Sequence, residues 1–144
     1  MTTGKPVTVL VVDDDEVDVM AVRRSFQSLH IPNAIVEANN GIEALEIMRG
    51  AAGRPKLAPP YLVLLDLNMP IMNGIEFLDE VRSDPDLSMT VVFVLSTSNA
   101  DEDRLTCYER HISGYVLKHR HGQSFVESMS MLEHYWRVVE FPVS

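Results

Sequence analysis

The sequence predicts an α/β fold, in which a five-stranded parallel sheet is covered by helices on both faces. Two observations lead to this prediction. Apolar runs of strand length alternate along the chain with segments whose apolar residues recur at helical spacing. The run 61–65 is apolar at every position, which is typical of a strand buried on both faces in the middle of a parallel sheet.

In the first half of the chain, we expect strands at 7–12 and 34–38. Apolar residues at helical spacing predict a helix after each of them: Val19, Val22, Phe26 and Leu29, then Ile42, Leu45 and Met48. Asp15 and Glu16 are best explained as the acidic start of the first helix. The segment 50–60 is rich in glycine and proline and is expected to be a surface loop.

In the second half, the central strand at 61–65 is followed by a capping-box pattern, Asn73 with Glu76, at the start of a third helix. Further strands are expected at 90–95 and 114–117, with a polar helix at 101–110 between them. A last helix is marked by apolar residues at i, i+4, i+7 and i+11: Phe125, Met129, Leu132 and Trp136. Right-handed crossovers between five such units favour the flavodoxin-like strand order 2-1-3-4-5.

Composition excludes several classes of protein. The net charge of −9 argues against nucleic-acid binding, which needs a cationic surface. Apolar stretches fall short of the roughly 18 residues that a membrane span requires, and 1–6 lacks the apolar core of a signal peptide. Cys107 is the only cysteine, so a disulfide framework is excluded. We therefore expect a cytoplasmic protein that binds neither nucleic acid nor membrane.

Polar side chains follow four of the five predicted strands: Asp13 with Asp14, Asp66, Ser96 and Lys118. Parallel strands end at the same edge of a sheet, so these groups should meet there. Three carboxylates at one place repel one another unless a cation is present, and oxygen ligands favour Mg²⁺. The backbone carbonyl of Asn68 is a candidate for a further ligand. The sequence therefore predicts a magnesium site at this edge.

The same group of side chains fits phosphoryl acceptance. Magnesium commonly takes only one or two carboxylates, which leaves one free as a nucleophile, and Asp66 is the candidate. A phosphoryl group on it would need positive charge and hydrogen-bond donors. Lys118 provides an ammonium group and Ser96 a hydroxyl group.

These residues resemble a response-regulator receiver domain of two-component signalling, over a match from about Val7 to Trp136. The motifs that carry it are Val11-Val12-Asp13-Asp14, 66–70 with Asn73-Gly74, Leu95-Ser96, and 114–118. The resemblance implies an aspartyl-phosphate at Asp66, metal binding by Asp13 and Asp14, a phosphate contact by Lys118, and a conformational switch through Ser96 and Tyr115. It also implies a histidine kinase as partner and no enzymatic activity beyond slow self-dephosphorylation.

A finer resemblance is to the single-domain regulators that are paired with bacterial phytochrome kinases. The segments 54–60, 95–98 and 135–142 carry it. It implies a phytochrome-type sensor kinase as partner. Fewer than 30 residues follow Lys118, so we expect no output domain.

Some interpretations stay open. Thr97 is an alternative to Ser96 as the switch hydroxyl, although only Ser96 has the family's spacing of about 22 residues to Lys118. Tyr115 could be an ordinary strand aromatic. His119 stands where receivers usually have proline, often in a cis bond; a cis bond before His119 would cost about 3–4 kcal/mol, so the alternatives are that this cost is borne locally or that the loop is reshaped. An adaptor that works without phosphorylation and an aspartyl-phosphate hydrolase are the alternative functions.

The sequence beyond the receiver domain at 1–136 is an apolar tail, 137–144. We expect a homodimer whose contacts come from the tail and the last helix: Phe125, Trp136, Val138, Val139 and Phe141. The alternative is that the tail folds back onto its own domain.

Overall fold

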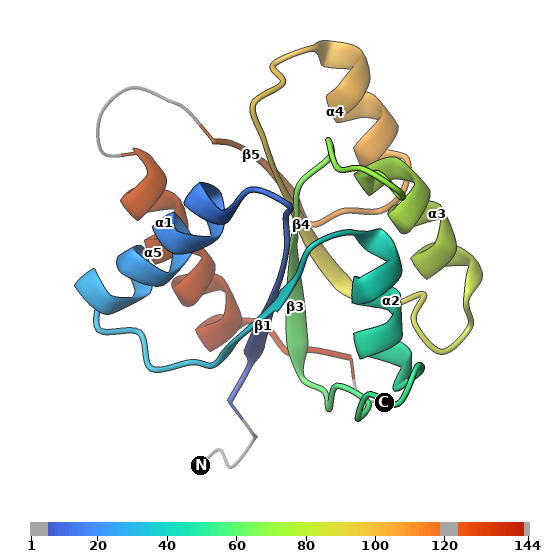
Figure 1. Ribbon diagram of the computed structural model, residues 1–144. Helices are drawn as coiled ribbons and strands as arrows, with labels where there is room; N and C mark the ends of the chain where they lie inside the picture. Colours follow the sequence, from blue (N-terminus) through green and yellow to red (C-terminus); the bar gives the residue numbers. More distant parts are fainter. Residues whose placement is uncertain (1–5, 119–123, 143–144) are drawn as a thin grey trace.

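The protein contains one five-stranded parallel sheet with the strand order β2-β1-β3-β4-β5, which confirms the predicted order (Figure 1). It is described by a computed structural model that covers residues 6–118 and 124–142. The strands are β1 (Thr8–Val12), β2 (Ile35–Ala38), β3 (Tyr61–Leu65), β4 (Val91–Ser96) and β5 (Gly114–Leu117). The fourth strand begins and ends one residue later than predicted, so that Ser96 belongs to the strand itself.

A helix follows each strand: α1 (Glu16–Ser28), α2 (Gly41–Arg49), α3 (Gly74–Ser83), α4 (Asp101–Tyr108) and α5 (Ser124–Val138). Helices α1 and α5 cover one face of the sheet, and α2, α3 and α4 cover the other (Figure 1). Among the described residues, none of these helices has the length and apolar character needed to cross a bilayer.

The central strand β3 separates two apolar cores. Val63 and Leu65 belong to the core under α2 and α3, while Leu62 and Leu64 belong to the core under α1 and α5. Alternate side chains of a strand point to opposite faces, so a strand covered on both sides must be apolar throughout. The structure thus explains why 61–65 has no polar residue.

Asparagine and aspartate side chains start the helices near the sheet's carboxyl edge. Asp15 caps α1 by accepting the N–H of Val17, which confirms the helix-start interpretation of this acid. Asn73 and Glu76 form the predicted capping box at the start of α3. These caps fix where the loops before α1 and α3 end.

The predicted boundary between domain and tail at residue 136 falls inside α5, which continues to Val138. Trp136 is buried in the chain's own core beside Phe26, with ring centroids 6.0 Å apart. Phe141 packs edge to face against Tyr135, with centroids 6.1 Å apart. The chain therefore folds back at Phe141, which is the alternative stated for the tail, whereas Val138 remains 64% exposed.

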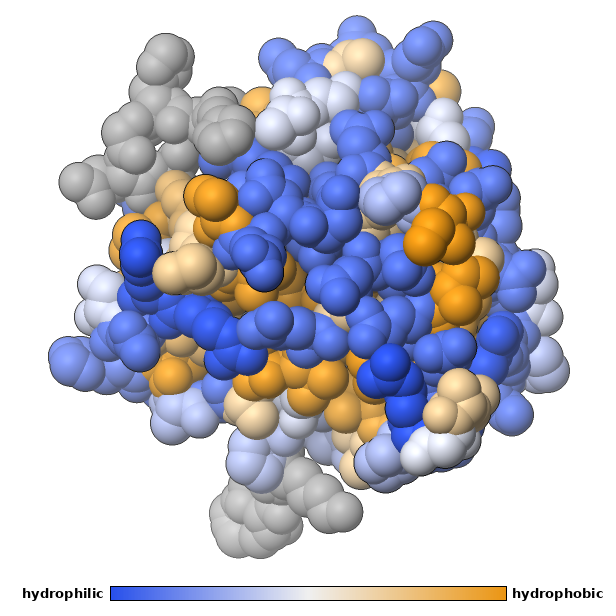
Figure 2. Space-filling model, viewed as in Figure 1, coloured by the Kyte–Doolittle hydropathy of each residue, from blue (hydrophilic) through white to orange (hydrophobic). Residues whose placement is uncertain are grey.

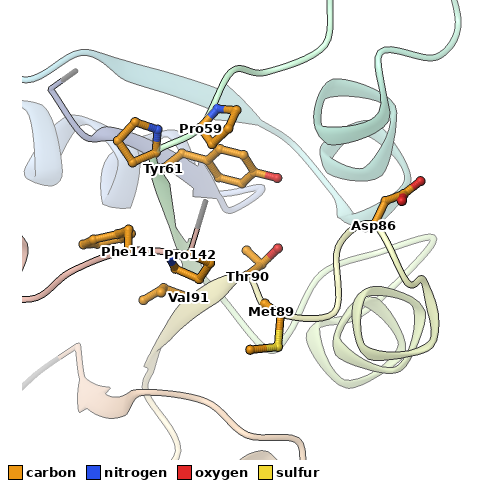
Figure 3. Close-up of a pocket in the computed structure, with 9 residues that line it drawn as sticks. Pro59, Tyr61, Asp86, Met89, Thr90, Val91, Phe141 and Pro142 are labelled. Carbon is orange, nitrogen blue, oxygen red and sulfur yellow. The ribbon is translucent and has the colours of Figure 1, made fainter. Parts of the chain in front are cut away.

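Phe141 and Pro142 also line a hollow whose other lining includes Pro59, Tyr61 and Val91 (Figure 3). Tyr61 and Val91 are the first residues of β3 and β4, so this hollow lies at the amino edge of the sheet. The strand-end acids lie at the opposite edge. The hollow is therefore a separate feature of the tail region.

Gly74 allows α3 to begin directly against the loop that follows β3. A Cβ atom at this position would lie 2.7 Å from the carbonyl oxygen of Asp66 and 2.7 Å from the Cα of Leu67. The N–H of Gly74 donates to the carbonyl of Leu67 at 2.9 Å. The contacts are with backbone, so the loop itself would have to move to accept a side chain.

We expect Gly74→Ala to lower the free energy of unfolding by about 1–3 kcal/mol, the usual cost of forcing atoms into a packed site. Urea denaturation measures this change. Gly53→Ala is a control for backbone strain without a steric contact, because no atom lies within 4 Å of the added Cβ but the left-handed φ of 78° disfavours any side chain by about 1–2 kcal/mol. A cost for Gly74→Ala below about 1 kcal/mol would contradict the steric explanation.

Candidate functional site

Three carboxylates meet at the carboxyl edge of the sheet. Asp13 and Asp14 follow β1 and Asp66 follows β3, and each can offer one oxygen so that all three oxygens lie within 4.8 Å of one another. Strands β1 and β3 are neighbours, and the N–H of Asp66 donates to the carbonyl of Val12 at 2.9 Å. Asp13 and Asp66 are only 4% and 6% exposed, whereas Asp14 is exposed.

Lys118, directly after β5, brings its ammonium group to these acids. Its Nζ lies 3.1 Å from Asp13 Oδ2 and 3.2 Å from Asp66 Oδ1. Its backbone N–H donates to the carbonyl of Ser96 at 2.8 Å, which ties the lysine to the end of β4. The structure thus brings the predicted acids and the lysine together.

Asp18 is a fourth acid of this site, and the sequence interpretation missed it. Lys118 Nζ lies 2.6 Å from Asp18 Oδ2, closer than to either of the other carboxylates. A signal was present in the sequence, because Asp18 precedes Val22 and Phe26 at intervals of four residues. Val22 and Phe26 are buried in the core under α1, so this stripe of the helix points inward.

Burial sets the acid–base properties of the cluster. It raises the pKa of Asp13 from 3.8 to about 6, even though the N–H of Asp15 and the charge of Lys118 favour the ionised form. It also raises the pKa of Asp66, against the opposing effect of Lys118. Burial alone would lower the pKa of Lys118, but the hydrogen bond to Asp18 and the charges of Asp13 and Asp66 raise it overall. Lys118 is therefore charged, and among the described residues of the site the carboxylates outnumber this ammonium group.

This charge balance fits a divalent cation. The three carboxylates of the cluster offer oxygens that one ion could reach together, and carboxylate oxygens are the donors that Mg²⁺ prefers. In the described part of the chain, Lys118 is the ammonium group that contacts them. Asn68 is exposed in the loop that follows β3, and its backbone N–H donates a hydrogen bond to the carboxylate of Asp66. A role for the Asn68 carbonyl as a metal ligand stays a prediction.

The two predicted switch residues are linked through Ser98. Ser96 is fully buried and its hydroxyl oxygen accepts the N–H of Ser98 at 3.0 Å, whereas Thr97 is exposed. The hydroxyl of the half-buried Tyr115 donates to the carbonyl of Ser98 at 2.9 Å. Both side chains therefore hold the same loop between β4 and α4. Their roles in switching stay predictions.

Other predicted features lie away from the acids or outside the described residues. Cys107 is a buried packing residue, and burial raises the pKa of its thiol to about 11. His119, at the position where receivers usually have proline, lies outside the described residues. Figure 2 shows hydrophilic residues over the upper middle of the visible face, where β1 and β3 end in Figure 1, with hydrophobic patches on either side.

Comparison with known proteins identifies the family to which the chain is similar. Residues 9–130 match the family model of the response regulator receiver domain. The response regulator Rcp1 of a Synechocystis species is 29% identical over 134 residues, which are 93% of this chain and 91% of Rcp1. The crystal structure of its Mn²⁺-bound form has a TM-score of 0.83 and covers 96% of this chain and 100% of that one.

Two further solved structures are similar over nearly the whole chain. The phosphorylated cyanobacterial phytochrome response regulator RcpA has a TM-score of 0.86 and 28% identity, and the match covers 96% of this chain and 99% of RcpA. The bacteriophytochrome response regulator AtBRR has a TM-score of 0.73 and 26% identity, with 95% and 99% covered. The chain is thus homologous to phytochrome response regulators.

The raised pKa of Asp13 predicts a pH dependence of stability. Between pH 3.8 and about 6 the folded protein binds more protons at Asp13 than the unfolded chain does, so the free energy of unfolding should fall as pH rises through this interval. The expected loss is on the order of 2–3 kcal/mol. Urea denaturation between pH 4 and 7.5 without divalent metal measures it, and Asp13→Asn should flatten the slope.

Magnesium should reverse this trend, because metal and proton compete for the same carboxylates. We expect added Mg²⁺ to stabilise the fold more at pH 7.5 than at pH 5. An equal stabilisation at both pH values would contradict the competition between metal and proton at the cluster. An unchanged slope in Asp13→Asn would contradict the assignment of this titration to Asp13.

Proposed function

This chain belongs to the response regulator receiver domain family, and on that premise we propose that it accepts a phosphoryl group on Asp66 from a sensor histidine kinase in a Mg²⁺-dependent reaction. The observation that supports the proposal most is the contact of a buried lysine with two acids of the cluster, Asp13 at 3.1 Å and Asp66 at 3.2 Å. The same side chains are those that the family resemblance assigns to phosphoryl transfer.

In the proposed reaction, a carboxylate oxygen of Asp66 attacks the phosphorus of a phosphohistidine. A phosphorus–oxygen bond forms, the phosphorus–nitrogen bond breaks, and the leaving imidazole takes its proton from solvent. Lys118 is already charged, so its ammonium group can pair with the new phosphoryl oxygens. Bound Mg²⁺, held by Asp13, Asp14, Asp66 and the Asn68 carbonyl, would supply further positive charge to those oxygens.

The signal would leave through the loop between β4 and α4. If the hydroxyl of Ser96 turns to donate to the phosphoryl group, the N–H of Ser98 loses its acceptor. Tyr115 holds the carbonyl of the same residue, so a shift of Ser98 also releases the tyrosine hydroxyl. The face formed by α4 and β5 would then present a changed surface to a partner.

The similarity to RcpA and AtBRR supports a phytochrome-type kinase as the partner. We further propose a cytoplasmic, non-enzymatic signalling protein that binds no nucleic acid, in keeping with the net charge of −9. A homodimer in which Val138 and Val139 take part is also proposed, since both are apolar and exposed at the end of α5.

Intact mass after incubation with a small phosphodonor, with and without Mg²⁺, tests the phosphoryl acceptance. We expect one phosphoryl group on the wild type only when Mg²⁺ is present, and none on Asp66→Asn, because the amide is a poor nucleophile. Asp86→Asn is the matched control, since Asp86 is exposed and lines the hollow at the other edge of the sheet. It should behave as the wild type.

An adduct on Asp66→Asn would place the acceptor elsewhere. Absence of an adduct on the wild type, with a cognate kinase also failing, would favour the phosphorylation-independent adaptor.

Light scattering tests the dimer. We expect the wild type to have the mass of two chains and Val138→Glu to shift toward one, because a charge would be buried in an apolar contact. Val17→Glu is the control, since Val17 is 73% exposed on α1 and Val138 is 64% exposed on α5. A monomeric wild type, or an unchanged mass for Val138→Glu, would count against this interface.

A further inference from the structure

We propose that Asp18 is a positioning residue that holds the ammonium group of Lys118 while Asp13 and Asp66 serve the metal ion and the phosphoryl group. This inference rests on the proposed function and extends it. It gives a role to an acid that lies on α1 and outside the three-carboxylate cluster.

The contacts of Lys118 are divided between two kinds of acid. Its ammonium group has three N–H donors, and three carboxylates surround it. Asp13 and Asp66, at 3.1 and 3.2 Å, are also members of the cluster that could hold a cation. Asp18, at 2.6 Å, is the partner that the lysine does not share with that cluster.

Asp13 and Asp66 contact Lys118 and also belong to the cluster that could hold a cation. Asp13 and Asp66 would have to serve both a divalent cation and the Lys118 ammonium group, and these two positive charges would repel each other at short range. With Asp18 present, Lys118 keeps a charged partner when the shared oxygens turn to the cation. Without it, the only acids of the described residues that pair with the ammonium group would be Asp13 and Asp66, so the lysine would oppose metal binding.

The position of Asp18 suits this role because a helix fixes it. Asp15 caps α1, and Asp18 lies one turn before the buried Val22. The Asp18 side chain is 19% exposed and that of Lys118 is 6% exposed, so the pair is largely shielded from water. A carboxylate on a packed helix holds the ammonium in one place better than a loop residue would.

A simpler explanation is that Asp18 only adds a favourable charge to the first turn of α1. Glu16 is the matched control for it, because Glu16 also lies in that first turn and is exposed. Removing either charge has a similar effect on the helix end. Only the removal of Asp18 takes a partner from Lys118.

Isothermal titration calorimetry with Mg²⁺ provides the first test and needs no phosphoryl transfer. We expect Asp18→Asn to raise the dissociation constant for Mg²⁺ by about five- to tenfold. Glu16→Gln should raise it by less than about twofold. Asp18→Glu keeps the charge and should remain near the wild-type affinity. Equal weakening by Asp18→Asn and Glu16→Gln would overturn the inference.

The second test asks whether Asp18 acts through the lysine. In a Lys118→Met background, adding Asp18→Asn should weaken Mg²⁺ binding no more than Glu16→Gln does. This double variant also lacks the unpaired buried ammonium that could destabilise Asp18→Asn alone. The same loss of affinity in both backgrounds would mean that Asp18 acts only by its charge, and would overturn the inference.

Phosphorylation by a small phosphodonor gives a third measurement. Asp18→Asn should raise the Mg²⁺ concentration for half-maximal rate about five- to tenfold and keep the rate at saturating Mg²⁺. A lower saturating rate with unchanged half-saturation would overturn the positioning role.

The tests also separate this inference from the proposed function. If the wild type shows no Mg²⁺ binding at all, the proposed function fails. If it binds Mg²⁺ but shows no coupling between Asp18 and Lys118, only this inference fails.

Discussion

The buried ion pairs of Lys118 are the interactions on which the acidic edge depends. Asp13 and Asp66 are almost fully buried, and a buried charge without a partner destabilises a fold by about 3–5 kcal/mol. One ammonium group serves both of them and Asp18 as well. It makes the acids tolerable in the folded state but leaves negative charge in excess. The acids at this edge are therefore compatible with a stable fold, and they still attract a further cation.

The fold provides this arrangement by bringing together residues that are far apart in the sequence. β1 and β3 are adjacent, so Asp13 and Asp66 leave the sheet side by side. β5 lies on the far side of β4, and the side chain of Lys118, directly after β5, reaches across to Asp13 and Asp66. Two backbone features fix the ends of the contact between Lys118 and Asp66. The backbone N–H of Lys118 donates a hydrogen bond to the carbonyl of Ser96, and Gly74 packs closely against the loop that follows Asp66. The chemistry thus depends on backbone positions as much as on side chains.

Much of this could be predicted from the sequence, because two simple rules govern it. Apolar runs and helical periodicity located the strands and helices, and the common direction of parallel strands brought Asp13, Asp66 and Lys118 together. Asp18 could not be predicted from apolar periodicity alone, because that pattern defines the buried stripe of α1 by its apolar members and does not show that an acid on the same stripe faces the site. The fold-back of Phe141 onto Tyr135 depends on a chain reversal after α5, which short-range patterns do not specify.

The contacts of Lys118 also explain how one site can reach two parts of the surface. Through Asp18 the ammonium group is joined to α1, and through the Ser96 carbonyl its backbone is joined to the end of β4. The hydroxyl of Ser96 and that of Tyr115 both hold Ser98, so the loop before α4 rests on the same strand end. A phosphoryl group that drew the ammonium toward Asp66 would pull on α1, while a turn of Ser96 would release the loop. Both connections start from Lys118, whose ammonium group contacts Asp66. The charge state of Asp66 would therefore govern both surfaces together.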